Sequence, residues 1–291
     1  MTRRCCAVNW PCSRTGTSAA TSAPPPASAS NDRPVVALHA VSKVFSNGTL
    51  ALSNMSLTVR RGEFLSLLGP SGCGKSTALR IIAGLGAPSS GTVDWPSSTI
   101  NAKGLPQGDI GFVFQDPTLM PWTTVFGNVY LPLKLHGMSK ADARPHIMET
   151  LALVGLADFA EAFPRELSGG MKMRVSIARA LVTNPKLLLM DEPFAALDEI
   201  TRQKLNDDVL KLWRSSGVTV VFVTHSVFES AYLSNRIVVM RSRPGQVFTD
   251  IALATSATRS DEYRTSEEYR ATTALVSKAL QDAIHAGGGA H

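Results

Sequence analysis

Long apolar segments are missing from this sequence of 291 residues. No stretch approaches the roughly 18 consecutive apolar residues that a membrane-spanning helix needs, so we expect none to cross a bilayer. Heptad patterns and internal repeats are missing too, which disfavours a coiled coil or a solenoid. The sequence is nevertheless 44% hydrophobic, enough to build the core of one large domain, or of two at most.

Cysteine is scarce. Cys5, Cys6 and Cys12 lie near the N-terminus, and Cys73 alone lies in the body of the chain. This usage provides no disulfide framework and suits a reducing compartment. The three N-terminal cysteines lack the spacing of a zinc site and have no histidine nearby, so we expect no metal there.

Acidic residues are almost missing from residues 1–33, where Asp32 stands alone and Ser, Ala, Thr and Pro dominate. We predict that this segment is a disordered tail. It has no apolar run of the kind that signal peptides contain, and a basic targeting role is the alternative. The net charge of +6 is compatible with anionic ligands, nucleic acid or a membrane surface, and does not choose among them.

From residue 34 onward, the pattern indicates alternating strands and helices. Residues 35–45 and 50–60 read as two strands that pair, and residues 63–68 form a short strand that leads through glycines into a helix. Further strands are predicted at 109–114, 187–190, 218–223 and 236–240, with a helix at 200–216 between the second and third of these. Near-continuous apolar strands separated by helices predict an α/β fold with a buried parallel sheet.

Residues 118–182 are predicted to be mainly helical. Ser139 is a candidate N-cap with Asp142 three positions on, and Pro145 lies deep enough to predict a kink or a late start of that helix. A final helix near the C-terminus, ahead of a flexible Gly-rich end, has an apolar face with one polar member, Thr273. The apolar members of that face are Tyr269, Val276, Leu280 and Ile284.

The segment GPSGCGKST at residues 69–77 matches the G-x-x-x-x-G-K-[ST] pattern of a phosphate-binding loop. Its glycines let backbone N–H groups point at phosphate oxygens, and the helix that follows adds its positive end. Lys75 brings a charge to the β- and γ-phosphates, Ser76 offers a hydroxyl to Mg²⁺, and Thr77 helps to hold the α-phosphate. The predicted nucleotide-binding residues of the loop are Gly69, Pro70, Ser71, Gly72, Cys73, Gly74, Lys75, Ser76 and Thr77.

Several single residues have both a functional and an ordinary interpretation. Asp191 and Glu192 end an apolar strand, where they could orient Mg²⁺ and accept a proton, or be two solvated acids. His225 ends another strand and could be catalytic, or a core or surface group. The amide of Gln115 could reach Mg²⁺ or an attacking water. Phe45 could be a core aromatic or a ring on which adenine stacks.

Together these motifs resemble the ATPase subunit of an ABC transporter over about residues 35–240. The resemblance rests on the order of Phe45, loop 69–77, Gln115, LSGGM at 167–171, LLLMDE at 187–192, ALD at 196–198 and His225. It implies a P-loop NTPase (RecA-like) core with an antiparallel β subdomain and a helical ABC-signature subdomain at about 118–182. The implied organisation is a tail at 1–33, an ATPase domain at 34–255, and a C-terminal helical extension with a flexible end at 256–291.

The resemblance also gives a use for the paired glycines of LSGGM. In that family, two subunits pack head to tail, so that Ser168, Gly169 and Gly170 of one copy close on the γ-phosphate held by the other copy. A helix beginning near Met171 would point its positive end at the anion. From the residues alone, Ser168 is a helix N-cap followed by tolerated glycines. The family usually has Gln at position 171, and Met cannot donate to a ribose hydroxyl.

The resemblance assigns the remaining roles. Glu192 would be the general base, and His225 would contact the γ-phosphate. Asp191 would orient Mg²⁺, Ser76 and Gln115 would be its ligands, and Asp198 would lie in a loop that crosses the dimer interface. The implied cofactors are ATP and Mg²⁺.

The implied function is ATP hydrolysis that energises an importer of the nitrate, sulfonate or taurine type. The expected partners are a second copy, membrane permease subunits and, indirectly, a periplasmic solute-binding protein. No nucleic acid is expected, and the expected location is the cytoplasmic face of the inner membrane. The apolar segment after Gln115 would receive a helix of the permease, or serve as helical core. The alternatives are a soluble ABC ATPase of translation or DNA repair, and a nucleotide-sensing regulatory subunit that does not hydrolyse ATP.

Overall fold

The structure is a computed structural model that describes residues 34–102, 104–106, 108–253, 259–260 and 262–287. The expected disordered tail and the end of the chain beyond Gly287 lie outside the described residues. The predicted boundary at 255/256 falls inside the undescribed segment 254–258, so it stays a prediction.

The core is a six-stranded sheet in the order β5-β6-β7-β3-β8-β9. Its strands are β3 (Phe64–Leu68), β5 (Ile110–Val113), β6 (Leu187–Asp191), β7 (Thr219–Thr224), β8 (Arg236–Arg241) and β9 (Gln246–Ala252). All neighbours pair in parallel except β9, which runs antiparallel at the edge. Every residue of β3, β6 and β7 is buried, which explains their near-continuous apolar sequences and confirms the predicted buried parallel sheet.

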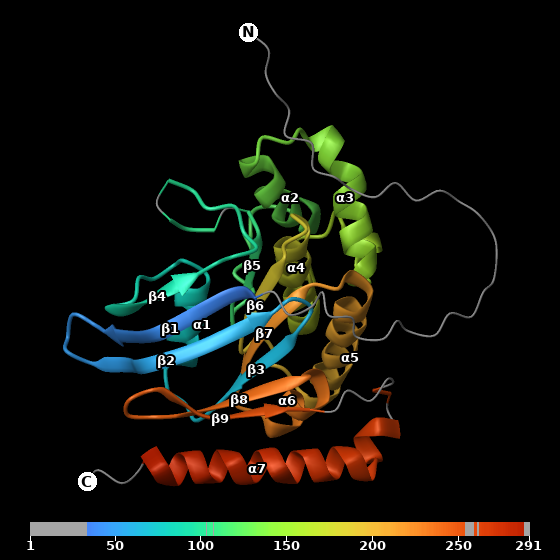
Figure 1. The fold of residues 1–291 in the computed structure, drawn as a ribbon. Coiled ribbons are helices and arrows are strands. Elements are labelled where there is room, and N and C mark those ends of the chain that lie inside the picture. The colour runs from blue at the N-terminus through green and yellow to red at the C-terminus, as the bar shows by residue number, and fades with distance from the viewer. Residues whose placement is uncertain (1–33, 103, 107, 254–258, 261, 288–291) are drawn as a thin grey trace, which may run out of the picture.

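A smaller antiparallel sheet of order β2-β1-β4 lies beside this core (Figure 1). Its strands are β1 (Pro34–Val44), β2 (Leu50–Arg60) and β4 (Ser90–Asp94). The predicted pairing of the first two strands is confirmed, and β4, which the sequence pattern did not indicate, adds to β1. Side chains of β1, β2, β3 and helix α1 (Lys75–Ile82) share one buried cluster, so α1 is held by both sheets.

Between β5 and β6 the chain forms the predicted helical region. It consists of α2 (Val125–Leu135), α3 (Lys140–Leu153), α4 (Gly169–Leu181) and the short 3-10 turns Ala157–Phe159 and Pro164–Glu166. The N-cap prediction for Ser139 is confirmed, because its hydroxyl accepts the N–H of Asp142. The predicted late start at Pro145 is wrong: the capped helix already begins at Lys140 and includes the proline.

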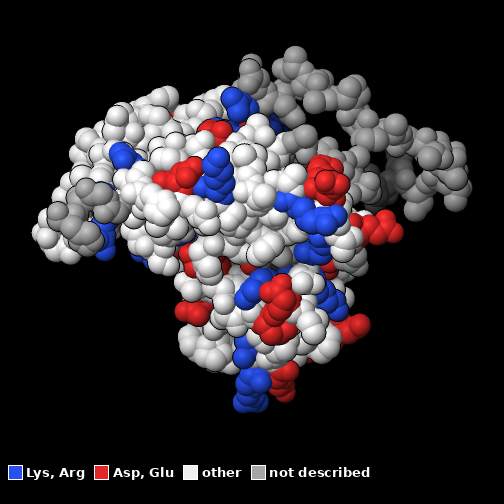
Figure 2. All heavy atoms as spheres, turned by 90° about the horizontal axis from the view of Figure 1, so that it is seen from below, with Lys and Arg blue, Asp and Glu red and all other residues white. Residues whose placement is uncertain are grey.

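Three further helices follow in the part of the chain that the structure describes: α5 (Glu199–Ser216), α6 (Val227–Leu233) and α7 (Glu267–Gly287), the last preceded by a 3-10 turn at Glu262–Thr265. Helix α7 packs against α6 and β8 and runs along one side of the core in Figure 1. No helix within the described residues is long and apolar enough to span a membrane. Seen from the α7 side, Lys and Arg are interspersed with Asp and Glu, and neither sign forms a continuous patch (Figure 2).

Candidate functional site

The glycine-rich loop joins β3 to the first turn of α1, as the sequence predicted. Gly74 has a φ of 91°, a left-handed conformation that glycine adopts without strain, and it caps α1. A Cβ atom on Gly74 would lie 2.7 Å from the carbonyl oxygen of Ala51. A Cβ atom on Gly69 would lie 2.7 Å from the carbonyl oxygen of Met240. These glycines therefore let the loop curl and press against β2 and β8.

Lys75 is buried and folded back over this loop. Its Nζ donates to the carbonyl oxygens of Gly69, at 2.8 Å, and Pro70, at 3.0 Å, and lies 3.7 Å from Oε1 of Glu192. Cys73 is buried below the loop, and burial raises the pKa of its thiol. The ammonium group therefore lies between the loop and the end of β6, while the cysteine serves as loop packing.

Ser76 and Asp191 form a direct pair between α1 and the end of β6. The Ser76 hydroxyl donates to Oδ1 of Asp191 at 2.7 Å. Asp191 is buried, and burial raises the pKa of its carboxyl, although the Ser76 hydrogen bond opposes that effect. Their hard oxygens are the ligand type that Mg²⁺ prefers, so the pair fits an ion that retains part of its water shell.

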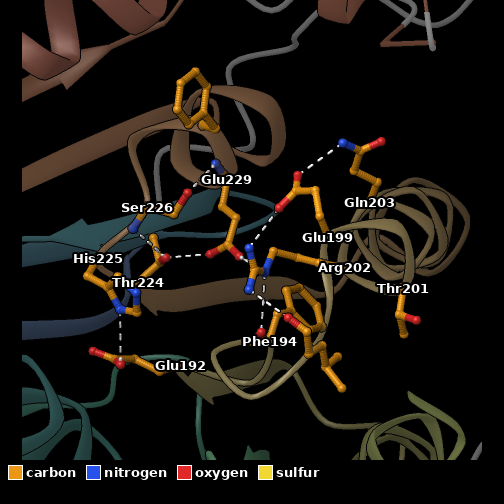
Figure 3. Close-up of polar contacts among 12 residues, drawn as sticks. Glu192, Phe194, Glu199, Thr201, Arg202, Gln203, Thr224, His225, Ser226 and Glu229 are labelled. Carbon is orange, nitrogen blue, oxygen red and sulfur yellow. Dashed lines mark hydrogen bonds and ion pairs between the residues drawn. The ribbon is translucent and has the colours of Figure 1, made fainter. Parts of the chain in front are cut away.

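Glu192 follows β6 in a left-handed conformation, with a φ of 46°. This conformation is rare for a residue other than glycine, and such strain often marks a functional position. Its N–H donates to the carbonyl oxygen of Val223 at 3.0 Å, which ties it to β7. Its Oε2 lies 3.2 Å from Nδ1 of His225. Figure 3 marks this contact with a dashed line. The fold therefore brings the predicted base and the predicted histidine into contact.

Lys75, Ser76 and Glu192 face a cavity of about 750 Å³, which has a polar and an apolar part. Five chain segments that are far apart in sequence form it. Its lining residues are Phe45, Thr49, Leu50, Ala51, Ser71, Gly72, Gly74, Lys75, Ser76, Thr77, Glu192, Ser242, Arg243, Gly245, Ile284 and Gly287. The structure thus places Phe45 at the same cavity as the phosphate-binding loop.

The LSGGM segment is not among the lining residues of this cavity. Ser168 caps α4 by accepting the N–H of Met171 at 3.3 Å, and the helix begins at Gly169, two residues earlier than expected. A Cβ atom on Gly170 would lie 2.6 Å from Cγ2 of Thr201 in α5, whereas Gly169 is exposed. The close packing of α4 against α5 within the same chain therefore explains the glycine at position 170. The surface formed by Ser168 and Gly169 is open.

Gln115 is also absent from the cavity lining, since it lies exposed just after β5. Among the described residues, no group of three or more His, Cys, Asp or Glu side chains is arranged to hold a metal. The oxygen pair of Ser76 and Asp191 is thus the part of the predicted metal site that the structure brings together.

A buried polar network behind Glu192 was not predicted from the sequence. The Thr224 hydroxyl donates to Glu229, and Arg202 Nε lies 3.6 Å from the same carboxylate (Figure 3). Arg202 also donates to the carbonyl oxygens of Leu197, at 2.7 Å, and Phe194, at 3.4 Å. The network therefore connects the segment after Glu192 to the end of β7. Nothing in the spacing of these residues could have indicated it.

The lining residues contributed by the β8–β9 loop and by α7 were also missed. The sequence placed Ile284 on an apolar helical face, but gave no sign of what that face meets. In the structure, Ile284 and Gly287 lie at the nucleotide-sized cavity together with Ser242 and Arg243. The amphipathic pattern of α7 was thus the one feature of the sequence that could have pointed to a role for this helix, and it did not indicate contact with the cavity.

Comparisons with known proteins agree on one family. The family model described as ABC transporter matches residues 52–195. A nitrate import ATP-binding protein of Synechocystis is 43% identical over 204 residues, which is 70% of this chain and 76% of that protein. An aliphatic sulfonates import ATP-binding protein of Bacillus subtilis is 44% identical over 196 residues, which is 67% and 74% of the two chains.

Solved structures agree with this assignment. A dimeric ATP-binding cassette in a post-hydrolysis state, bound to ADP and Pi, has a TM-score of 0.66 and 38% sequence identity. The match covers 76% of this chain and 100% of that chain. The predicted fold of a P-loop ATPase core with a helical region is thereby confirmed.

Proposed function

Since the chain belongs to the ABC transporter family as one of its ATP-binding, ATP-hydrolysing subunits, we propose that it powers solute import through a separate membrane permease. The observation that carries the proposal is that Lys75 and Glu192 line one cavity, with His225 in contact with Glu192 and Asp191 bonded to Ser76. This arrangement combines a phosphate-binding loop with a carboxylate poised at its edge.

We propose that the triphosphate lies along the loop and the adenine ring stacks on Phe45. Lys75 gives up its two carbonyl contacts to reach the β- and γ-phosphates, which form stronger, charge-assisted hydrogen bonds. Ser76 and Asp191 would hold Mg²⁺, with Gln115 as a further ligand, and the ion would neutralise phosphate charge. Gln115 would have to move toward the cavity to take part.

Glu192 is the proposed general base. Its carboxylate lies at the rim of the cavity, where it can accept a proton from a water that attacks the γ-phosphate. His225, whose Nδ1 lies 3.2 Å from this carboxylate, would orient it and contact the γ-phosphate. Lys75, on the other side of Glu192, keeps the carboxylate close to the phosphates.

The second half of each site is proposed to come from a second copy. Ser168 and the exposed N-terminus of α4 are outside the cavity of their own chain, yet have the free N–H groups that bind anions. In a head-to-tail pair, they would cover the γ-phosphate held by the other copy. The dimeric state of the cassette with ADP and Pi described above supports a pairing of two copies.

The proposed partner in the membrane is a permease, with a periplasmic solute-binding protein acting on it. Trp122 and Leu135, 76% and 79% exposed in the segment after Gln115, support a docking surface there for a permease helix. The proposed location is the cytoplasmic face of the inner membrane, because such a subunit must reach both ATP and the permease. The importing relatives support nitrate or a sulfonate as the solute class.

The proposal is tested by measuring uptake of labelled nitrate and of labelled aliphatic sulfonate in cells whose copy of this gene is deleted. Wild-type protein should restore uptake of one of the two. Glu192→Gln should not, because it loses roughly 10²–10⁴ in turnover while still binding ATP. Glu262→Gln, which changes an exposed carboxyl group outside the site, is the matched control.

Two results would count against parts of the proposal. Uptake and ATP hydrolysis at wild-type rates with Glu192→Gln would remove Glu192 as the base. Unchanged uptake of both solutes in the deletion strain would reject the solute class, and leave the ATPase assignment in place.

A further inference from the structure

The last turn of α7 forms part of the wall of the nucleotide cavity. Ile284 and Gly287 line it together with the β8–β9 loop, about 200 residues after the phosphate-binding loop. A second observation fixes this position: a Cβ atom on Gly287 would lie 2.8 Å from the carbonyl oxygen of Ser242, so the helix end touches that loop directly. Neither contact belongs to the motifs that identify the family.

Helix α7 is anchored along its length, so its end is held at the cavity. Val276 and Ala283 are fully buried against β3 and β8. At the other end of the helix, the Tyr269 hydroxyl donates to the carbonyl oxygen of Phe228 in α6 at 3.1 Å. Because Ala283 is fixed, the next residue, Ile284, has a defined place at the rim.

The cavity has an apolar part that is made of exposed side chains. Phe45, Leu50 and Ile284 are 45%, 43% and 46% exposed, so each has apolar surface that a ligand could cover. All three line the same cavity. An apolar, ring-shaped ligand such as a purine base would cover them, and phosphate would not.

The charges around the cavity also indicate where the phosphates and the base of a nucleotide would lie. The phosphate-binding loop supplies Lys75, backbone N–H groups and the positive end of α1. The C-terminal end of α7 carries partial negative charge, and Ile284 has no hydrogen-bond donor. Arg243 of the adjoining β8–β9 loop also lines the cavity, so the assignment rests on the contrast between the donors of the phosphate-binding loop and the apolar Ile284, which favours the base of the nucleotide.

We propose that α7 completes the base-binding half of the nucleotide site, with Ile284 in contact with the base on a different wall from Phe45. This inference rests on the proposed ATP binding and names an additional specificity-determining residue for it. Ile284 contributes to the affinity for nucleotide, and has no part in the reaction at the γ-phosphate.

The test is calorimetric titration of the full chain with MgATP and, separately, with magnesium tripolyphosphate, which lacks a base. Ile284→Ser should weaken ATP binding about fivefold, because apolar contact with the base is lost. Tripolyphosphate affinity should stay at the wild-type value. Leu275→Ser is the matched control, since Leu275 is 53% exposed on the same helix and does not line the cavity. Ile284→Ala serves as a second variant that keeps the helix apolar.

Three outcomes would overturn the inference. ATP affinity could be unchanged in both Ile284 variants. Leu275→Ser could weaken ATP binding as much as Ile284→Ser, which would indicate a general effect on α7. Equal weakening of ATP and tripolyphosphate binding would place the effect at the phosphates. A wild-type protein that binds no ATP would instead reject the proposed function itself.

Discussion

Glu229 is a buried carboxyl group, 7% exposed, in the polar network behind Glu192. Burial raises its pKa above the ordinary value of 4.5, although the Thr224 hydroxyl and Arg202 oppose that effect. The folded protein therefore holds this proton more tightly than the unfolded chain does. Its stabilising contribution is complete below pH 4.5 and is lost as the pH rises through the raised folded-state pKa.

We accordingly predict a different pH dependence for Glu229→Gln. From pH 4.5 upward, the free energy of unfolding of the wild type should fall relative to that of this variant, whose side chain does not titrate. Urea denaturation between pH 4 and about 7 measures both curves. Glu262→Gln, at an exposed carboxyl, should keep the wild-type curve. Parallel curves for the wild type and Glu229→Gln would show that Glu229 is not the group responsible.

Single residues of the site differ in how far the sequence could predict them. Lys75, Ser76, Asp191 and Glu192 could be proposed from the sequence because each sits at a fixed place in a local motif, where a strand ends or a helix begins. Arg202 and the Glu229 network were not found, because the fold alone brings α5 and α6 to the same strand end. Tertiary contacts between long-separated residues leave no spacing signal.

At the level of elements, the contact between α4 and α5 explains one glycine of the signature segment. Gly170→Ala would put a Cβ atom 2.6 Å from the Thr201 methyl group and should cost about 1–3 kcal/mol of stability through overpacking. Gly169→Ala should be close to neutral, because its nearest neighbour, Leu197, would lie at an ordinary 3.5 Å. Thermal unfolding of the two variants measures the difference.

A rescue experiment separates this contact from other effects of the substitution. Thr201→Ser removes the obstructing methyl group and keeps the hydroxyl, so the double variant Gly170→Ala/Thr201→Ser should regain most of the lost stability. Equal melting temperatures for Gly169→Ala and Gly170→Ala would mean that packing against α5 does not require the second glycine.

The elements themselves were predictable where apolar periodicity was strong. Strands β3, β6 and β7 of the central sheet are buried on both faces, and their sequences show it. The sequence pattern did not predict β4 and β9, because they are edge strands with exposed, partly polar residues. The helical face of α7 was predicted, but its position against β8 and the cavity depends on packing over the whole fold.

At the scale of the molecule, the proposed function gives each chain two unlike halves of a site on different surfaces. The cavity contains Lys75 and Glu192, and the open helix end at Ser168 lies outside it. Two copies related by a twofold axis could join these halves twice, since such an interface repeats every contact. Hydrolysis would then require the pair. A copy with one defective half could still form an active site by contributing its intact half to a partner whose other half is intact.

This leads to a complementation test. Lys75→Ala removes the charge that binds phosphate, and Ser168→Glu places a negative charge where the second copy's γ-phosphate is proposed to lie, so each variant alone should hydrolyse little ATP. A mixed pair keeps one intact site, formed by Lys75 of one copy and Ser168 of the other. Mixing equal amounts should restore phosphate release to about a quarter of the wild-type rate, because half of random pairs are mixed and each has one good site of two. A Ser168→Glu chain that is fully active alone, or a mixture no more active than its parts, would contradict a site shared between copies.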